Sequence, residues 1–358
     1  MLLYRISNNR FLDAVIGKTV NAAMYLLRVL NRFIYSGKKY NNTLTIISLH
    51  KLGDSILTFP TVNYFIQNHQ RPITLLCWDS TVTLYKFAFP NLEIDSVKKS
   101  EFLWGTRIAS KNARKVLRSK SSETIIDITG SIVSVSLVSL TGYRKLIGFS
   151  NHYLKSIYDE WVTERSIPHL RDKYFDVVRL IDSTAEIDNF VLKKESTNFK
   201  GRILIHPFGG WAAKEWGINN FIALAKRLKT NYEVKLIAEN SESIKDERIT
   251  KLKTIDDLFY EIREHDLLIG NDSGPIHLAD MLGKFTIAIY GPTNPNYCKP
   301  YGENNFEIFG NAECRPTTEN YCYLMGGLLC DDYKCMNQLS VDEVYNQICK
   351  IIEKINAS

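Results

Sequence analysis

Leu267–Gly283 reads LLIGNDSGPIHLADMLG, and Thr286–Thr293, which follows at once, reads TIAIYGPT. An apolar run, a polar turn, a helical segment and a second apolar run predict a βαβ unit, with the turn at the carboxyl end of a parallel strand. Open α/β sheets hold their ligands at that end of the strands. The pattern therefore predicts a parallel α/β sheet with a ligand site at this turn.

The turn combines residues that favour the start of a helix. Asp272 and Ser273 are suitable N-cap residues. Gly274 allows a close approach of the backbone to a ligand, and Pro275 suits the first helical turn. Backbone amides at a helix start can face an anion. The turn fits an anion site and also simple capping of a buried helix, and its own sequence does not separate the two.

Length and composition indicate an ordinary globular protein. The chain has 358 residues, of which 45% are hydrophobic and 23% are charged, enough for two domains with cores of their own. No run approaches the roughly 18 consecutive apolar residues of a membrane-spanning helix. The start of the chain also lacks the compact apolar core of a signal peptide. We therefore expect a soluble or peripheral protein in the cytoplasm.

The net charge is concentrated at the start of the chain. Seven basic residues and one acid give residues 1–40 a net charge of +6, which equals the net charge of the whole chain. Apolar residues recur there every three or four positions, at Leu12, Ile16, Val20, Ala23, Leu27, Leu30 and Ile34. On another face fall Lys18, Asn21, Arg28 and Arg32. This pattern predicts a basic amphipathic helix, which either lies on an anionic membrane surface or packs on the first domain. The neutral remainder has no extended basic track, so we expect no nucleic-acid partner.

Strand and helix patterns alternate in two successive halves. We expect a basic arm over residues 1–40, a Rossmann-like domain over 41–190, a second over 201–338 and a closing helix over 339–358, with polar linker sequence near 183–200. Strands are predicted at 43–49, 73–78, 124–128, 145–149, 202–207 and 232–238, besides those of the opening unit. Helices are predicted at 56–67, 131–140, 219–229 and 341–355. The expected fold class is α/β with two doubly wound parallel sheets.

Three segments, each placed after a predicted strand, carry a resemblance to a known family. They are His50–Pro60 (HKLGDSILTFP), His206–Trp216 (HPFGGWAAKEW) and Gly270–Leu278 (GNDSGPIHL). In this order and spacing they resemble the signature segments of glycosyltransferase family 9, the heptosyltransferases of lipopolysaccharide assembly. Two details depart from the usual pattern. The first segment begins His-Lys in place of an arginine, and Phe208-Gly209-Gly210 replaces a more common Gly-Ala-Ser.

The resemblance implies the two-domain GT-B fold, with the acceptor held mainly by the first domain and the nucleotide sugar mainly by the second. It implies an inverting, metal-independent transfer of a sugar, most simply a heptose from ADP-heptose. The implied acceptor is a lipopolysaccharide core or another lipid-linked oligosaccharide at the cytoplasmic face of the inner membrane. The basic arm would then contact the anionic surface of that membrane.

The resemblance also assigns roles to single residues. Asp54 matches the position of the general base that takes a proton from the acceptor hydroxyl, and it also suits a helix N-cap. Lys214, with the amides around Ser273 and Gly274, is the candidate for stabilising the leaving nucleoside diphosphate. Asp272 is expected to order the turn or to bind a ribose hydroxyl.

Other residues of the segments are candidates for substrate contact. His277, one helical turn after Ser273, is either a ligand contact or a core histidine with its hydrogen bonds satisfied. Glu239 or Glu242, beyond a strand end, is a candidate for the ribose. The remaining candidates adjoin the base and the lysine in the sequence and are Gly53, Ser55, Gly209 and Gly210.

Other function classes are weighed against the same motifs. A serine hydrolase would need a Gly-x-Ser-x-Gly elbow, and a Rossmann dehydrogenase would need Gly-x-Gly-x-x-Gly after a strand; the sequence has neither. A nucleotide-sugar 2-epimerase on the same fold would share the Asp-Ser-Gly turn but not the first segment. A catalytically silent, membrane-associated scaffold would need neither Asp54 nor Lys214.

Four of the seven cysteines lie close together in the sequence, at Cys314, Cys322, Cys330 and Cys335. In a cytoplasmic protein they favour a metal site or a loop of reduced thiols over disulfides. Their spacing lacks the paired Cys-x-x-Cys of common zinc sites. Family relatives often carry a cysteine-rich loop at this place. A bound zinc or iron would therefore be structural, and catalysis is expected to need no cofactor.

Overall fold

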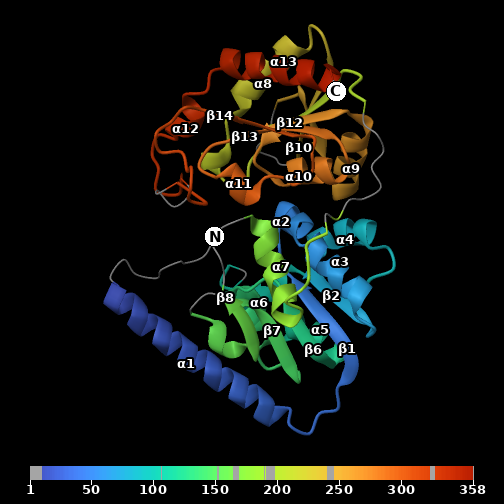
Figure 1. Ribbon diagram of the computed structural model, residues 1–358, viewed down its shortest axis with the longest axis vertical. Helices are drawn as coiled ribbons and strands as arrows, with labels where there is room; N and C mark the ends of the chain where they lie inside the picture. Colours follow the sequence, from blue (N-terminus) through green and yellow to red (C-terminus); the bar gives the residue numbers. More distant parts are fainter. Residues whose placement is uncertain are drawn as a thin grey trace. The chain divides into compact units, whose positions relative to one another are not determined.

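The computed structural model describes residues 10–105, 107–150, 153–163, 169–188, 190, 198–239, 246–322 and 327–357. The chain divides into two compact units (Figure 1). Unit 1 comprises Met1–Lys51, Leu57–Arg165 and Arg171–Phe190. Unit 2 comprises Leu52–Ile56, Ser166–Leu170 and Val191–Ser358. Each unit is built on one six-stranded parallel sheet, so the predicted α/β class is confirmed.

Unit 1 holds a parallel sheet in the order β3-β2-β1-β6-β7-β8. The strands are β1 (Asn41–Ser48), β2 (Ile73–Trp78), β3 (Glu93–Val97), β6 (Ser122–Asp127), β7 (Lys145–Ser150) and β8 (Glu160–Thr163). Ile46 of β1 lies between Leu75 of β2 and Ile126 of β6. These central strands are buried on both faces, which is why they are continuous apolar runs in the sequence. The direction of winding reverses between β1 and β6, as in a doubly wound sheet.

The helices of unit 1 are α3 (Phe59–Asn68), α4 (Val82–Ala88), α5 (Lys111–Lys120), α6 (Ile132–Val138) and α7 (Leu170–Ile181). Short 3₁₀ turns are η1 (Asp79–Thr81), η2 (Lys99–Glu101) and η3 (Lys155–Ile157), and β4 (Phe102–Leu103) pairs with β5 (Ile108–Ala109) in a small antiparallel hairpin. The predicted buried helix at 131–140 is α6. The single helix predicted at 56–67 is wrong: α2 (Leu52–Leu57) ends before Thr58 and α3 starts afresh, because Pro60 suits a first helical turn but not a helix interior.

The predicted amphipathic helix is present as α1 (Arg10–Ile34), and it packs on unit 1. Met24 is buried, and Ile16, Val20 and Leu27 are partly buried against the unit 1 core. Part of the basic face also contacts unit 1, although Lys18 is exposed and the Arg32 side chain is 54% exposed. Arg28 donates to the Tyr158 carbonyl, and Arg32 pairs with Asp159. Asn21 accepts hydrogen bonds from both Ser156 N, at 3.2 Å, and Ser156 Oγ, at 2.9 Å.

Unit 2 repeats the sheet pattern of unit 1, in the order β11-β10-β9-β12-β13-β14. The strands are β9 (Arg202–His206), β10 (Glu233–Glu239), β11 (Ile249–Leu252), β12 (Leu267–Asn271), β13 (Phe285–Tyr290) and β14 (Asn305–Phe309). Helices are α8 (Ile218–Leu228), α9 (Ile255–Glu264), α10 (Gly274–Met281), α11 (Pro295–Cys298), α12 (Lys334–Asn337) and α13 (Val341–Ala357), with the 3₁₀ turn η4 (Ala212–Lys214). The predicted βαβ unit is β12, α10 and β13. In the core of unit 2, α13 packs beside α8 (Figure 1).

In the two six-stranded sheets, the strands that the sequence patterns did not predict are all edge strands. β3, β8, β11 and β14 are four or five residues long and carry charged or polar side chains, as edge strands commonly do. Their short, mixed patterns carry too little alternation to stand out from loops. Within the described ranges, no helix is both long enough and apolar enough to cross a membrane.

Candidate functional site

The topology of unit 2 brings two of the three sequence segments together. β9 ends at His206 and β12 ends at Asn271, and these strands are neighbours, with Gly270 paired to His206. The winding of the sheet reverses between them, which is where open α/β sheets bind ligands. Only glycine fits at position 270, because a Cβ there would lie 2.7 Å from the His206 carbonyl oxygen.

Asn271 joins the loops that follow the two strands. Its side chain is buried; Oδ1 accepts from Trp216 N at 3.0 Å, and Nδ2 donates to the Pro207 carbonyl at 2.7 Å. Trp216 is also buried, and its indole Nε1 donates to the Leu339 carbonyl at 2.8 Å. The second and third segments are therefore packed against each other by hydrogen bonds that neither segment forms alone.

The start of α10 leaves a polar side chain unused. Ser273 occupies the N-cap position with an extended backbone, as expected, but its side chain makes no capping hydrogen bond. The Ser273 Oγ is buried and has no hydrogen-bond partner among the described residues. The role of Asp272 also differs from capping, since its carboxylate binds Lys214. A hydroxyl and a helix start are thus left for a bound group that accepts hydrogen bonds.

Lys214 is held as a buried cation. It ends η4, its ammonium pairs with the Asp272 carboxylate, and Nζ lies 4.2 Å from the centre of the Trp211 ring. Burial is the largest single influence and lowers the pKa of Lys214, but Asp272, Cys298 and Asp54 together outweigh it and raise that pKa above its ordinary value. Lys214 therefore keeps its positive charge at neutral pH. A buried, charged ammonium beside a helix start can stabilise a phosphate group.

Sequence reasoning missed two residues of this cluster. Trp211 lies three positions before Lys214, and an aromatic residue so close to a candidate cation was a usable signal for a cation–π contact. Cys298, from α11, donates its thiol to Asp272 Oδ2 at 3.6 Å, and burial raises the pKa of that thiol. No sequence signal pointed to Cys298, because 26 residues separate it from Asp272.

The first segment also contributes to this site, because Leu52–Ile56 groups with unit 2. Gly53 and Gly274 face each other closely: a Cβ on Gly53 would lie 3.3 Å from Gly274 Cα and 2.9 Å from His277 Cδ2. A Cβ on Gly274 would lie 3.2 Å from Gly53 N. Both glycines are therefore needed for the backbones to approach, and the first segment meets the third at the start of α10.

Asp54 follows Gly53 and acts electrostatically on the same cluster. Its carboxylate adds to the raised pKa of Lys214 and also acts on His277. Burial lowers the pKa of His277 to about 4, so the imidazole is neutral at neutral pH. His277 Nδ1 is buried and finds no hydrogen-bond partner among the described residues. The unpartnered Nδ1 favours a ligand contact for His277 over a core role, and this role stays a prediction.

The other predicted residues have simpler surroundings. Ser55 is buried in α2. Gly209 N donates to Glu215 Oε1 at 3.0 Å, and a Cβ on Gly209 would lie 3.1 Å from Lys214 Cβ. Gly210 has no atom within 4 Å of the place where a Cβ would stand. Glu239 ends β10 with an exposed side chain, and Glu242 lies outside the described residues.

The four clustered cysteines are close enough to influence one another. Burial first, and then Cys314, Cys322 and Cys330, raise the pKa of Cys335 to about 12. Cys330 Sγ accepts a hydrogen bond from Tyr333 N at 3.3 Å. All four carry free thiols. In the described part of the chain no three His, Cys, Asp or Glu side chains are grouped so that they could hold a metal ion.

Comparison with known proteins now identifies the family. The model of glycosyltransferase family 9 (heptosyltransferase) matches residues 111–326, more than half of the chain. The chain belongs to glycosyltransferase family 9. The resemblance drawn from the three segments is therefore confirmed.

Individual relatives of this family member are distant. Lipooligosaccharide heptosyltransferase 2 of Campylobacter jejuni (serotype O:6, strain 81116) is 26% identical over 156 residues, 39% of this chain and 48% of that protein. The match thus spans about half the length of this curated relative. Among solved structures, a glycosyl transferase family 9 protein of Veillonella parvula matches with a TM-score of 0.69 and 18% identity, covering 89% of this chain and 98% of the other. E. coli heptosyltransferase WaaC with ADP matches with a TM-score of 0.63 and 15% identity, covering 86% and 99%. At these identities the structures show the fold, and the expected GT-B architecture is confirmed.

Proposed function

We propose that this protein is a glycosyltransferase that moves a sugar from a nucleotide donor to a hydroxyl of an oligosaccharide acceptor, with inversion at the anomeric carbon. The observation that carries the proposal is the cluster at the start of α10. There a charged lysine, two carboxylates and a neutral histidine act on one another, and the same helix start holds a serine hydroxyl without a partner, at the winding reversal of the sheet. Family membership favours the same reaction.

In this proposal the transfer is a single displacement. The acceptor oxygen attacks the anomeric carbon, the bond from that carbon to the diphosphate oxygen breaks, and the acceptor proton passes to the Asp54 carboxylate. Negative charge develops on the leaving diphosphate. The Lys214 ammonium and the amides at the start of α10 lie together in the structure and would stabilise it. Asp272 would keep Lys214 charged and oriented until the diphosphate binds.

We further propose a heptose as the sugar and ADP-heptose as the donor. The support is the heptosyltransferase name of the family and of the Campylobacter relative, and the ADP in the E. coli structure. The nucleotide sugar would bind mainly within residues 201–338, and Glu239 or Glu242 would contact the ribose. The acceptor, a lipopolysaccharide core or another lipid-linked oligosaccharide, would bind mainly within residues 41–190.

A lipid-linked acceptor implies work at a membrane surface. We propose that the protein is peripheral at the cytoplasmic face of the inner membrane, with residues 1–40 as the contact. The support is the basic composition of this segment, in which Lys18 and Lys39 are exposed and suit an anionic surface. We also propose that catalysis needs no metal ion, since Lys214 already supplies a buried positive charge where a metal would act on a diphosphate.

The test is a donor panel of ADP-heptose and UDP-, GDP- and dTDP-hexoses, with binding measured by calorimetry and nucleotide release measured with an oligosaccharide acceptor. Asp54→Asn should reduce the rate of transfer by about 10²–10⁴-fold while the donor still binds. Lys214→Met should weaken donor binding and reduce the rate by about 10²–10³-fold. Asp256→Asn and Lys226→Met, at exposed positions on α9 and α8, are the matched controls.

Each outcome separates the alternatives. Transfer that depends on Asp54 supports the proposal, and the donor that binds identifies the sugar. Conversion of the free nucleotide sugar to its 2-epimer, without transfer, would favour an epimerase. If the Asp54 variant behaves as its control and no nucleotide sugar binds, the scaffold function replaces the enzyme.

A further inference from the structure

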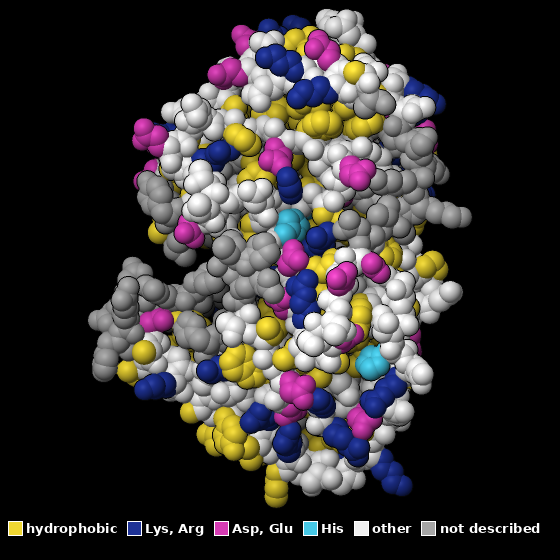
Figure 2. Space-filling view, in the orientation of Figure 1, with side chains coloured by type: hydrophobic (Ala, Val, Ile, Leu, Met, Phe, Trp, Pro, Cys, Tyr) yellow, Lys and Arg dark blue, Asp and Glu magenta, His cyan; other side chains and the backbone are white. Residues whose placement is uncertain are grey.

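The outer face of α1 is apolar and exposed. Phe33 is 79% exposed and Leu26 is 66% exposed. The exposed large apolar side chains of this face are Leu12, Val15, Leu26, Val29, Leu30 and Phe33. They repeat at helical spacing, so they form one stripe along the helix. Figure 2 shows hydrophobic side chains reaching the surface along α1, with basic side chains beside them. A continuous apolar stripe of this kind marks an interaction surface, whereas single exposed apolar residues are common.

This stripe is not the face by which α1 packs on unit 1. The opposite face is anchored by Met24 in the core, by Asn31 Oδ1, which accepts from Gly142 N at 3.3 Å, and by the pairing of Arg32 with Asp159. Tyr35, just after the helix, donates to the Leu140 carbonyl at 2.7 Å. Because these contacts fix the helix in place, the exposed stripe is not needed for the packing of unit 1. Its outward position has to be explained by something outside the unit.

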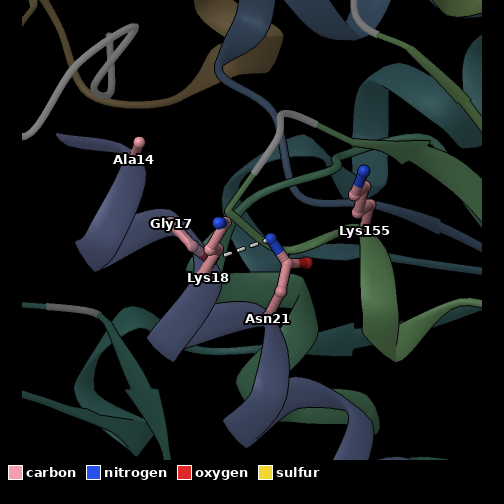
Figure 3. A pocket seen from close by; sticks show the side chains of 5 residues that line it. All are labelled: Ala14, Gly17, Lys18, Asn21 and Lys155. Atoms are coloured by element: carbon pink, nitrogen blue, oxygen red, sulfur yellow. Dashed lines mark hydrogen bonds between the residues drawn. The ribbon is translucent and has the colours of Figure 1, made fainter. Parts of the chain in front are cut away.

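A basic hollow lies along one flank of α1. It has a volume of about 320 Å³ and is lined by Ala14, Gly17, Lys18 and Asn21 of α1 and by Lys155 of η3 (Figure 3). Asn21 Nδ2 donates to the Gly17 carbonyl at 2.9 Å, which turns the amide along the helix and leaves the lysines on the two sides of the hollow (Figure 3). The lining includes two lysines and no acidic residue. The hollow therefore presents two basic residues without a competing carboxylate.

We propose that the outer face of α1 docks on an anionic phospholipid surface. In this arrangement the stripe enters the boundary between headgroups and acyl chains, and Lys18 and Lys155 bind a lipid phosphate in the hollow. Helices that lie in a membrane interface combine these two features, an apolar face and a basic flank. The inference rests on the membrane partner proposed above and identifies the face that contacts it. The membrane contact does not include Ile16, Val20 and Leu27. These residues belong to the apolar pattern of the sequence, but they pack against the core of unit 1.

Charge favours lipid over a second copy of the chain as the occupant. Lys18 and Lys155 both line the hollow, so a second copy of this face would bring like charges together, whereas an anionic surface neutralises them. Trp161 of β8 adds an interfacial aromatic residue beside the hollow, since its ring centre lies 5.1 Å from Lys155 Nζ. Tryptophan and lysine both favour the headgroup region of a bilayer.

The test is flotation of the full-length protein with vesicles of phosphatidylglycerol and phosphatidylcholine, and with vesicles of phosphatidylcholine alone. Leu26→Asp combined with Phe33→Asp should weaken binding to the mixed vesicles at least about tenfold, because two apolar anchors are lost. Leu329→Asp is the matched control, since Leu329 is an equally exposed leucine, at 63%, in unit 2. Circular dichroism and thermal unfolding should show that all variants remain folded.

The hollow is tested separately. Lys18→Glu combined with Lys155→Glu should weaken binding to the mixed vesicles by about fivefold per lysine or more, and an ionic strength of about 1 M should remove this difference. Lys226→Glu, an exposed lysine on α8, should have no effect. The proposal is overturned if the stripe variant floats like the wild-type protein, or if both control variants lose as much vesicle binding as the test variants. It is also overturned if sedimentation shows that the stripe variant dissociates a dimer while its vesicle binding is unchanged. Donor binding by calorimetry should be unchanged in every variant, so a failure of membrane docking is distinct from a failure of the proposed reaction.

Discussion

Replacing Asp272 by asparagine should strongly destabilise unit 2. The Asp272 side chain is 4% exposed and its partner Lys214 is 11% exposed, so the variant leaves a buried ammonium without its carboxylate. Removing one partner of a buried ion pair typically costs about 3–5 kcal/mol. Here the ammonium keeps its contact with the Trp211 ring, so we expect the lower end, about 3 kcal/mol, or roughly a hundredfold in the unfolding equilibrium.

The measurement is hydrogen exchange of peptides that cover β12 and α10, followed at increasing urea concentrations, because this reports the unfolding of unit 2 directly. Lys214→Met and the double variant complete a double-mutant cycle. The double variant should recover about 2 kcal/mol relative to Asp272→Asn, because no unpaired charge is left inside. A loss of less than about 1 kcal/mol in the free energy of unfolding for Asp272→Asn would refute the buried pair as a stabilising unit. The same conclusion would follow if the loss in the double variant equalled the sum of the losses in the two single variants.

Three further predictions concern the same region. The pKa of His277 is about 4 in the folded protein, whereas an unfolded histidine has a pKa near 6.5. As the pH falls from 6.5 to 4, the unfolded state therefore binds a proton that the folded state does not. The free energy of unfolding should fall by up to about 3 kcal/mol over this range. His277→Gln should reduce this acid sensitivity in urea titrations at each pH, and an unchanged slope would contradict the assignment. Gly53→Ala should cost about 1–3 kcal/mol in thermal unfolding, because its Cβ meets His277 at 2.9 Å, whereas Gly210→Ala, with open space, should be near neutral. Dialysis against a chelator should leave the rate of sugar transfer unchanged, and a rate restored only by added metal would show that the reaction needs an ion.

The placement of the sheet and the site could largely be predicted from the sequence, because the central strands are long apolar runs and the segments follow them directly. β12 and α10 are within a few residues of their predicted bounds for this reason. The edge strands could not be predicted, since β11 and β14 have no clear alternation and exist because a neighbouring strand pairs with them. Tertiary pairing decides such strands, and a single sequence does not display it.

The side-chain partners within the site were also beyond sequence reasoning. Asp272 was expected to order the turn or to bind a ribose hydroxyl, and nothing in the sequence indicated that its carboxylate binds Lys214, 58 residues earlier in the chain. For α1 the difficulty was of another kind. A helix that is apolar on two faces gives a periodic pattern that does not show which face packs. Ile16 and Leu12 therefore belonged to one predicted face, although Ile16 packs against the core of unit 1 and Leu12 is 48% exposed.

The pairing of Lys214 with Asp272 has a consequence for turnover. In the proposed reaction, the spent diphosphate leaves a site where a resident carboxylate is ready to take back the cation. The protein thus carries an internal competitor for its own product. Such a competitor lowers the affinity for every anion by the same amount. Singly charged anions of the cell, which bind weakly, would then not stay bound, whereas a diphosphate has more charge and more contacts and would still bind. Because the spent diphosphate binds less tightly beside this competitor, its release should be faster than from a site with an unpaired lysine.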